Sequence, residues 1–237
     1  MADSATVLIV EDEESYVDAL TVALHREGFR VEVARDGAEA LIVFGRVQPD
    51  LVLLDVMLPK ITGIDVCREL RKRSSVPIIM VTAKTGEIDT VVGLEVGADD
   101  YVTKPYRMRE LIARMRAAMR RAPADAQQAV STPGVISVGD VSLDPDEHLV
   151  NVRGESVSLP LKEFALLHLL LANAGRVLTR ETLIDRVWGI DYVGDTKTLD
   201  VHIKRLRNRL EQDTSNPELI VTIRGLGYKY ERPRVTA

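Results

Sequence analysis

The stretch LVLLDVMLP, residues 51–59, places an acid directly after an apolar segment. Four consecutive apolar residues lead into Asp55, and three more apolar residues and a proline follow it. A carboxylate at the end of a hydrophobic strand costs several kcal/mol unless other groups compensate its charge. The position of Asp55 therefore predicts a functional acid whose partners come from other parts of the chain.

Short apolar runs of the same kind recur through the first half of the chain and alternate with helical patterns. Strands are predicted at 6–10, 30–34, 51–54, 77–81 and 101–103, and helices at 14–27, 37–46, 63–73, 86–97 and 106–121. Continuous apolar strands between amphipathic helices indicate a parallel sheet covered on both faces. Five such units in about 120 residues predict an α/β domain, a five-stranded doubly wound parallel sheet of flavodoxin-like order.

The second half of the chain has a different pattern of predicted strands and helices. Short strand-like pieces between 135 and 159 precede helical patterns at 161–173, 180–187 and 196–211, and two short strands close the chain around Gly225 and Gly227. This order predicts an α+β winged helix-turn-helix domain. We expect domains at 1–121 and 135–233, joined by a linker at 122–134 that is rich in Ala, Gln, Pro and Ser. A frayed continuation of the preceding helix is the alternative for that segment.

Bulk properties exclude several classes of protein. The net charge is −5, and Cys67 is the single cysteine, which excludes an internal disulfide and a cysteine-rich metal site. No apolar run approaches the roughly 20 residues that span a bilayer, and the N-terminus lacks a signal-peptide pattern. We therefore expect a cytoplasmic protein without a membrane partner.

The ends of the predicted parallel strands carry the chemistry of the first domain. Such sheets bind ligands beyond the carboxyl ends of their strands. The residues that follow or end the strands are Glu11, Asp12, Asp55, Thr82 and Lys104. Clustered carboxylates need a cation, and an all-oxygen ligand set favours Mg²⁺, with Asp12 and Asp55 as direct ligands and Glu11 acting through water.

A carboxylate is also a nucleophile towards phosphorus. Asp55 would then accept a phosphoryl group, with Mg²⁺ and Lys104 offsetting its charge and the Thr82 hydroxyl donating to a phosphoryl oxygen. The alternative, that each residue is an ordinary loop polar group, requires a coincidence at four strand ends.

The segments VLIVEDEE (7–14), LLDVMLP (53–59), VTAKTGE (81–87) and GADDYVTKPY (97–106) resemble the signature segments of bacterial response-regulator receiver domains. The resemblance implies that Asp55 is the phosphoacceptor, Thr82 the switch hydroxyl, Tyr101 the switch aromatic and Lys104 the family's lysine. It implies further that the Met57 backbone carbonyl is a metal ligand and that a sensor histidine kinase donates the phosphoryl group.

The predicted fourth helix, fifth strand and fifth helix share a charged surface, on which resemblance to the OmpR/PhoB branch of regulators implies a phosphorylation-dependent homodimer. Its members are Glu95, Asp99, Asp100, Glu110, Arg114 and Arg116. Resemblance to the OmpR/PhoB branch implies pairs across the dimer, of which Asp100–Arg114 and Glu95–Arg116 are candidates. Thr90 stands where relatives carry a basic residue, so one pair is missing. A solvated charged face is the alternative, because exposed ion pairs contribute only about 0–1 kcal/mol each.

The segment GDTKTLDVHIKRLRNRLE, 194–211, is the candidate DNA-reading helix. Leu199, Ile203, Leu206 and Leu210 form its buried stripe, and Val201 is expected to be exposed on the opposite side, where it can touch a thymine methyl. Arg205 lies on that side for base readout, and Asp200 either accepts from cytosine or orients an arginine. The remaining predicted phosphate or base contacts are Lys197, Thr198, His202, Lys204 and Arg207, with Thr222, Arg224 and Tyr228 from the closing hairpin.

Residues 159–189 and 200–210 resemble the effector domain of OmpR/PhoB-type regulators. The sequences of both domains are most similar to the RegX-type regulators of actinobacteria, which the resemblance links to phosphate limitation. The implied partners are double-stranded DNA with tandem half-sites and RNA polymerase. Trp188 and the loop 189–195 are the candidate polymerase contact, with a core position as the alternative for Trp188.

Two other functions stay open at this level. A haloacid-dehalogenase-type phosphatase also uses an aspartate at a strand end, but that class needs a second aspartate where this chain has Met57. A receiver joined to a protein-binding winged helix would keep the phosphoacceptor and lack DNA affinity. The regulator hypothesis treats the chain as a non-enzyme that accepts a phosphoryl group and is able to lose it by autodephosphorylation.

Overall fold

A computed structural model describes residues 4–83, 93–119, 134–189, 192 and 197–232. The chain divides into two compact units, Met1–Met119 and Arg120–Ala237. Residues 122–133 of the predicted linker and most of the predicted helix 86–97, including Thr90, lie outside the described residues. Among the residues that are described, no helix is both long and apolar enough to cross a membrane.

The first unit is a five-stranded parallel sheet with the order β2-β1-β3-β4-β5. Its strands are β1 (Thr6–Val10), β2 (Arg30–Ala34), β3 (Leu51–Leu54), β4 (Ile78–Thr82) and β5 (Asp100–Thr103). Its helices are α1 (Glu14–Arg26), α2 (Gly37–Val47), α3 (Gly63–Arg71) and α5 (Met108–Met119). The predicted α/β class, strand order and parallel sheet are confirmed, with β4 shifted by one residue from the prediction.

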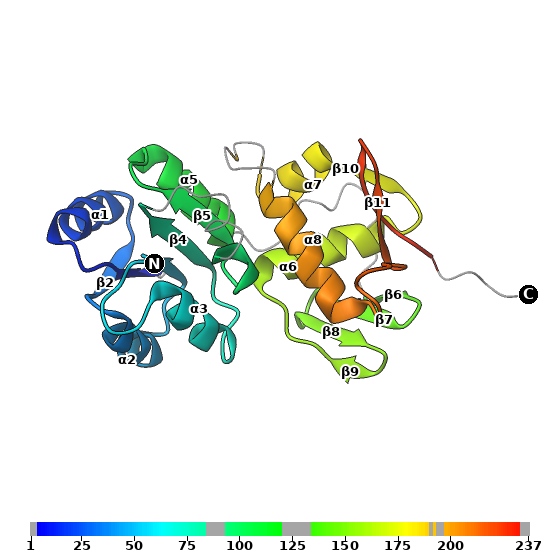
Figure 1. The fold of residues 1–237 in the computed structure, drawn as a ribbon, viewed down its shortest axis with the longest axis horizontal. Helices are drawn as coiled ribbons and strands as arrows, with labels where there is room; N and C mark the ends of the chain where they lie inside the picture. The colour runs from blue at the N-terminus through cyan, green and yellow to red at the C-terminus, as the bar shows by residue number, and fades with distance from the viewer. Residues whose placement is uncertain (1–3, 84–92, 120–133, 190–191, 193–196, 233–237) are drawn as a thin grey trace, which may run out of the picture. The chain divides into compact units, whose positions relative to one another are not determined.

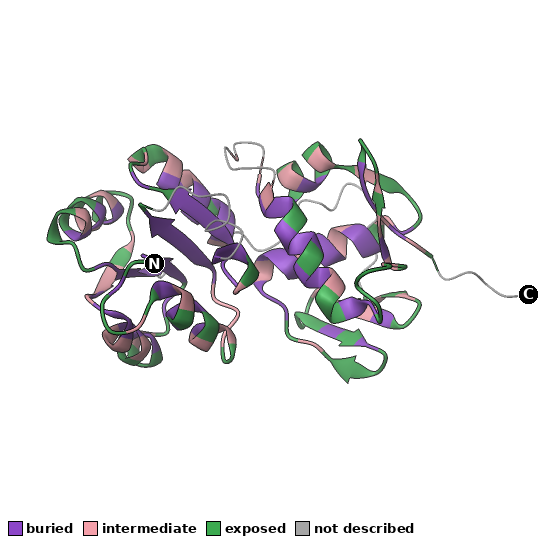
Figure 2. Ribbon diagram, viewed as in Figure 1, coloured by how far each residue is buried: buried purple, intermediate pink, exposed green. Residues whose placement is uncertain are grey.

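The helices cover both faces of this sheet, with α1 and α5 on one side and α2 and α3 on the other (Figure 1). All residues of β1, β3 and β4 are buried. Figure 2 shows the buried strands between helices that are exposed on their outer sides. Strands buried on both faces must be apolar throughout, which is why their sequences read as continuous runs and not as alternating patterns.

The described residues of the second unit form two small antiparallel sheets and three helices. The first sheet has the order β6-β7-β8-β9 and the second β10-β12-β11. The strands are β6 (Ile136–Val138), β7 (Val141–Asp144), β8 (Leu149–Val152), β9 (Glu155–Ser156), β10 (Val177–Thr179), β11 (Ile220–Ile223) and β12 (Gly227–Tyr230). The helices are α6 (Leu161–Ala172), α7 (Arg180–Val187) and α8 (Lys197–Leu210), so the predicted winged-helix layout is confirmed.

The core of the second unit explains two features of its sequence. Leu199, Ile203, Leu206 and Leu210, the predicted stripe of α8, all belong to the buried cluster. Trp188 belongs to the same cluster and is 2% exposed, so the core alternative holds for this residue. The strand β10 was not predicted, because three residues give no periodic signal and its pairing with β12 is set by tertiary contact.

Candidate functional site

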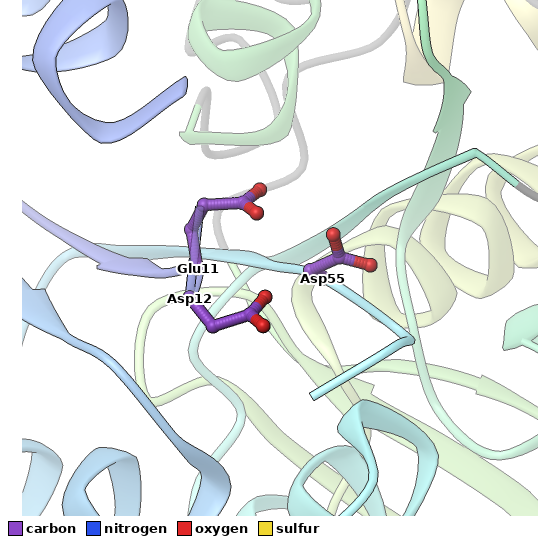
Figure 3. A group of neighbouring side chains, drawn as sticks. All are labelled: Glu11, Asp12 and Asp55. Atoms are coloured by element: carbon purple, nitrogen blue, oxygen red, sulfur yellow. The ribbon is translucent and has the colours of Figure 1, made fainter. Parts of the chain in front are cut away.

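The carboxyl ends of β1 and β3 bring three acids together. Glu11 and Asp12 directly follow β1, Asp55 directly follows β3, and these two strands are hydrogen-bonded neighbours. Ligand oxygens of the three carboxylates lie within 4.8 Å of one another. Figure 3 shows the carboxylates facing a common space. Glu11 and Asp55 are buried, whereas Asp12 is exposed.

Lys104 closes this cluster from the end of another strand. It follows β5, and its Nζ donates to Oε2 of Glu11 and to Oδ2 of Asp55, both at 2.6 Å. The peptide bond between Lys104 and Pro105 is cis. A buried ammonium between two buried carboxylates offsets the cost of placing these charges out of water. We define these residues, with Thr82 at the end of β4, as the candidate phosphoacceptor pocket: Glu11, Asp12, Asp55, Thr82 and Lys104.

The backbone around Asp55 is held by local contacts. The amide N–H of Asp55 donates to the Val10 carbonyl at 2.9 Å, and the Met57 N–H donates to Oδ1 of Asp55 at 2.9 Å. Gly63 sits so close that a Cβ built on it would lie 1.9 Å from the Asp55 carbonyl oxygen. Only glycine fits this approach, which places the start of α3 against the backbone of Asp55.

Two ionisable groups of the pocket have shifted pKa values. Burial raises the pKa of Glu11 above its ordinary value, because the hydrogen bond from Lys104 only partly opposes this effect. For Lys104, burial alone would lower the pKa, but the hydrogen bonds to Asp55 and Glu11 outweigh burial and raise it. The lysine is therefore charged at neutral pH, and its charge is directed at the acids.

The pocket suits a magnesium ion on chemical grounds. Three carboxylates face one ammonium, so negative charge is in excess, and all candidate ligand atoms are oxygens. Glu11, Asp12 and Asp55 would hold the ion. Met57, whose carbonyl is the fourth predicted ligand, lies two residues past Asp55 with 59% of its surface exposed.

The two predicted switch residues lie on neighbouring strands. Thr82 ends β4 and is 0% exposed, and its carbonyl accepts from the Lys104 N–H at 2.7 Å. Tyr101 lies in β5, directly opposite Met80 of β4, and is 7% exposed. Its ring lies against Gly93, because a Cβ on that glycine would be 3.1 Å from two ring carbons.

Two aromatic residues beside Lys104 were not predicted from the sequence. Tyr16, in the first turn of α1, has its ring centroid 4.1 Å from the Lys104 Nζ. The ring of Tyr106 lies 6.4 Å from that of Tyr16, and burial raises its pKa to about 12. Tyr16 follows Glu11 by five residues, and Tyr106 follows Lys104 by two. This closeness in sequence to pocket residues was the only signal in the sequence that could have indicated them.

The predicted dimer surface is only partly a surface. Asp99 is 0% exposed, and its carboxylate accepts from Arg71 at 2.5 Å and from the Ile78 N–H at 2.9 Å. The expectation that Asp99 lies on the surface is therefore wrong, because this carboxylate joins α3 to the start of β4.

The other predicted dimer residues have partners within one chain. Arg114 pairs with Asp100 at 3.0 Å and with Glu110 at 2.8 Å. The side chain of Arg116 pairs at 2.5 Å with Glu27, which directly follows α1, while Glu95 is exposed. Asp100 and Arg114 are both buried, so a pair between two copies would first have to replace this one.

The structure corrects the predicted exposed face of α8. Val201 is 6% exposed, so the expectation of an outward valine is wrong, although Val201 is not part of the unit's core cluster. Three other predicted contacts on this helix are also buried: Thr198, His202 and Arg205. The predicted residues of α8 that keep exposed or half-exposed side chains are Lys197, Asp200, Lys204 and Arg207.

Each of these three buried polar residues has a defined neighbour. Arg205 forms an ion pair with Glu163 of α6, a carboxylate that is 0% exposed. The ring of His202 lies 5.2 Å from that of Trp188. The Tyr192 hydroxyl donates to Thr198 at 3.2 Å.

The closing hairpin is tied to α8. The Tyr228 hydroxyl donates to Asp200 at 2.5 Å, and Arg180 of α7 pairs with the same carboxylate oxygen at 2.6 Å. Asp200 thus orients an arginine, one of its two predicted roles. Arg207 donates to the Thr222 hydroxyl at 2.8 Å, and Arg224 is exposed at the turn. Tyr228 is 5% exposed, which the prediction of a phosphate contact did not anticipate.

Known proteins match both halves of the chain. Residues 7–116 match the family described as "Response regulator receiver domain", and residues 154–230 match "Transcriptional regulatory protein, C terminal". A "Sensory transduction protein RegX3" of Mycolicibacterium smegmatis is 62% identical, and one of Mycobacterium tuberculosis is 60% identical. Each of these two alignments covers 95% of this chain and 99% of the relative.

Solved structures agree with these matches. DrrB of Thermotoga maritima, described as an OmpR/PhoB homologue, is 30% identical with a TM-score of 0.51. A mutant of RitR is 26% identical with a TM-score of 0.77. Both alignments cover 97% of this chain and 100% of the solved one.

Proposed function

Because the chain belongs to the OmpR/PhoB family of two-component response regulators, with a receiver domain and a DNA-binding domain, we propose that phosphorylation of Asp55 controls its binding to DNA. The donor is a sensor histidine kinase, the partner that a receiver domain implies. The output is regulation of transcription. The proposed domain bounds are 1–121 and 135–233, with the linker at 122–134.

The observation that carries the phosphoacceptor role is the contact of Lys104 with Asp55 and Glu11 at 2.6 Å. An oxygen of Asp55 attacks phosphorus, the bond from phosphorus to the donor nitrogen breaks, and the donor imidazole leaves with the electron pair. Lys104 stabilises the charge that develops on the phosphoryl oxygens, and the Thr82 hydroxyl donates a hydrogen bond to one of them. Glu11, Asp12, Asp55 and the Met57 carbonyl would hold magnesium, which would offset further negative charge on the phosphoryl group.

Labelling by acetyl phosphate tests this assignment. The wild-type chain should take up one phosphoryl group in the presence of magnesium, and Asp55→Ala should take up none. Chelation of magnesium should abolish labelling of the wild type. Labelling that persists in Asp55→Ala would place the acceptor on another residue.

Phosphorylation is read out through Thr82 and Tyr101 on the neighbouring strands β4 and β5. A phosphoryl group adds about −1.5 to −2 charge at neutral pH. Thr82 moves towards it, and the Tyr101 ring follows, which changes the surface of β5 and α5. On this surface, two copies dimerise by replacing ion pairs within each chain with ion pairs between the two chains. The internal Asp100–Arg114 pair becomes a pair between subunits, and Glu95, Glu110 and Arg116 lie around it.

DNA binding is assigned to α8 and the closing hairpin. Lys204 contacts phosphates, and Arg224 enters the minor groove. Arg205 exchanges its ion pair with Glu163 for the edge of a guanine. Contacts from Lys197, Thr198, Asp200, His202, Arg207, Thr222 and Tyr228 complete the set. Two copies read tandem half-sites about 10–10.5 bp apart.

DNA affinity across salt tests this second assignment. The phosphorylated chain should bind double-stranded DNA in a gel shift, with an affinity that falls steeply as the salt concentration rises. An absence of DNA affinity at low salt would favour a protein-binding winged helix. The RNA polymerase contact is assigned to the loop 189–195, most of which lies outside the described residues, because Trp188 is in the core.

The 60–62% identity to proteins named RegX3 supports a regulon of phosphate-limitation genes. Transcripts of a strain that carries Asp55→Ala should differ from the wild type mainly when phosphate is scarce. If the difference between the Asp55→Ala strain and the wild type were the same in low and high phosphate, the chain would not be a regulator of phosphate-limitation genes. Measurable turnover of small phosphate esters would favour the phosphatase alternative.

A further inference from the structure

The ring of Tyr16 lies against Lys104 of the candidate phosphoacceptor pocket. Tyr16 lies in the first turn of α1, and the Lys104 Nζ is 4.1 Å from its ring centroid. The same nitrogen donates to Glu11 and Asp55 at 2.6 Å. Lys104 therefore has three partners, two charged and one aromatic.

These partners respond differently to the reaction. When an Asp55 oxygen bonds to phosphorus, that residue no longer offers a full carboxylate charge to Lys104. A metal ion at the acids likewise competes with Lys104 for Glu11. The face of an aromatic ring attracts an ammonium through its quadrupole, and no step of the reaction alters it. Of the three contacts, the one with Tyr16 is independent of the state of the acids.

We propose that Tyr16 is a positioning residue for phosphoryl transfer, whose ring holds the Lys104 ammonium in line with the phosphoryl oxygens after Asp55 has been consumed. This inference rests on the proposed phosphorylation of Asp55. It gives the ring a role in both formation and loss of the phosphoryl group, because both transition states place negative charge where Lys104 acts.

Tyr106 supports this arrangement. It follows Lys104 by two residues, its ring centroid is 6.4 Å from that of Tyr16, and it packs against the buried cluster of the first unit. The two rings meet at an interplanar angle of 36°. Tyr106 thereby limits the positions open to the Tyr16 ring, which keeps that ring under Lys104.

Nuclear magnetic resonance of the metal-free protein tests the contact directly. Protons on the Lys104 Cε should be shifted upfield by the ring current in the wild type and in Tyr16→Phe. The shift should vanish in Tyr16→Leu. Equal Lys104 shifts in the wild type and Tyr16→Leu would show that the ring does not hold the ammonium in solution.

Rates of labelling by acetyl phosphate test the consequence. Tyr16→Leu should be phosphorylated about three- to tenfold more slowly than the wild type, the range expected for a partly desolvated cation–π contact. Tyr16→Phe should stay within about twofold, and Val22→Ala, on the exposed side of α1, should match the wild type. Equal rates for Tyr16→Leu and a labelled wild type would overturn the inference, whereas an unlabelled wild type would overturn the proposed function instead.

A series of fluorinated phenylalanines in place of Tyr16 guards against misfolding of Tyr16→Leu. Fluorination withdraws charge from the ring face and leaves its shape nearly unchanged. The labelling rate should fall steadily as fluorine atoms are added. A rate that is independent of fluorination would refute a role for the ring's charge distribution.

Discussion

The Nζ of Lys104 lies 2.6 Å from Oδ2 of Asp55, although 49 residues separate the two in sequence. Parallel strands make this possible, because β3 and β5 both end at the same edge of the sheet, on either side of β4. Both residues are buried, so each charge depends on the other and on Glu11. A change to any one of these three charges should therefore affect both the stability of the first unit and the reactivity of the pocket.

Lys104→Met should lower the stability of the first unit when no metal is present. The substitution leaves Glu11 and Asp55 buried without their ammonium, a change that costs about 3–5 kcal/mol for buried pairs. Magnesium chloride should restore part of this loss, because the ion supplies the missing positive charge. Thermal unfolding with and without magnesium checks this, and a variant as stable as the wild type in chelator would contradict it.

Gly63→Ala should destabilise the first unit and slow labelling of Asp55. The added Cβ would lie 1.9 Å from the Asp55 carbonyl oxygen, which is backbone and cannot move without displacing Asp55. Gly45→Ala is the matched control in α2, where a Cβ meets nothing within 4 Å. That control should gain about 0.5–1 kcal/mol, the helix-interior difference between the residues. Equal stabilities for the two variants would contradict the close approach at Gly63.

The first unit could be predicted well from sequence because its signals are local. Apolar runs such as 51–54 mark strands, and the residue after each strand must lie at one edge of the sheet. The burial of Asp99 could not be predicted, because its partner Arg71 belongs to another element, 28 residues away. Adjacent acids in a charged segment look alike until the fold pairs Asp99 with Arg71 and Asp100 with Arg114.

The candidate DNA-reading helix α8 shows a different limit of prediction from sequence. Helical periodicity identified the core stripe of α8 correctly, since it depends on one apolar partner surface. It did not predict that Val201 and Arg205 would be 6% and 7% exposed. The partner of Arg205 is Glu163, which stands near the start of a different helix, and a sequence pattern along α8 contains no information about it.

Arg205→Met and Lys204→Met should have different effects although the residues are neighbours. Loss of Arg205 leaves the buried Glu163 with Arg209 at 3.3 Å, so the second unit should lose about 3 kcal/mol of stability. The preference of this variant for particular bases in DNA should also weaken, because Arg205 is the residue proposed to contact a guanine edge. Lys204 is exposed, so its loss should leave stability unchanged and reduce the salt dependence of DNA binding by about one phosphate contact. Fluorescence of Trp188, the single tryptophan, follows unfolding of this unit.

The stability of the second unit should fall as the pH drops below the ordinary pKa of histidine. Burial lowers the pKa of His168 in α6 below its ordinary value of 6.5, because the charged imidazolium is poorly solvated there. The unfolded chain then binds more protons than the folded chain between these two pKa values, so unfolding is favoured as pH falls through that window. Above 6.5 the histidine is neutral in both states and contributes no pH dependence. Melting followed by Trp188 fluorescence should show this fall, and His168→Gln should flatten it, whereas His25→Gln in the first unit should not. A melting profile with the same slope in His168→Gln would assign the pH dependence to other groups.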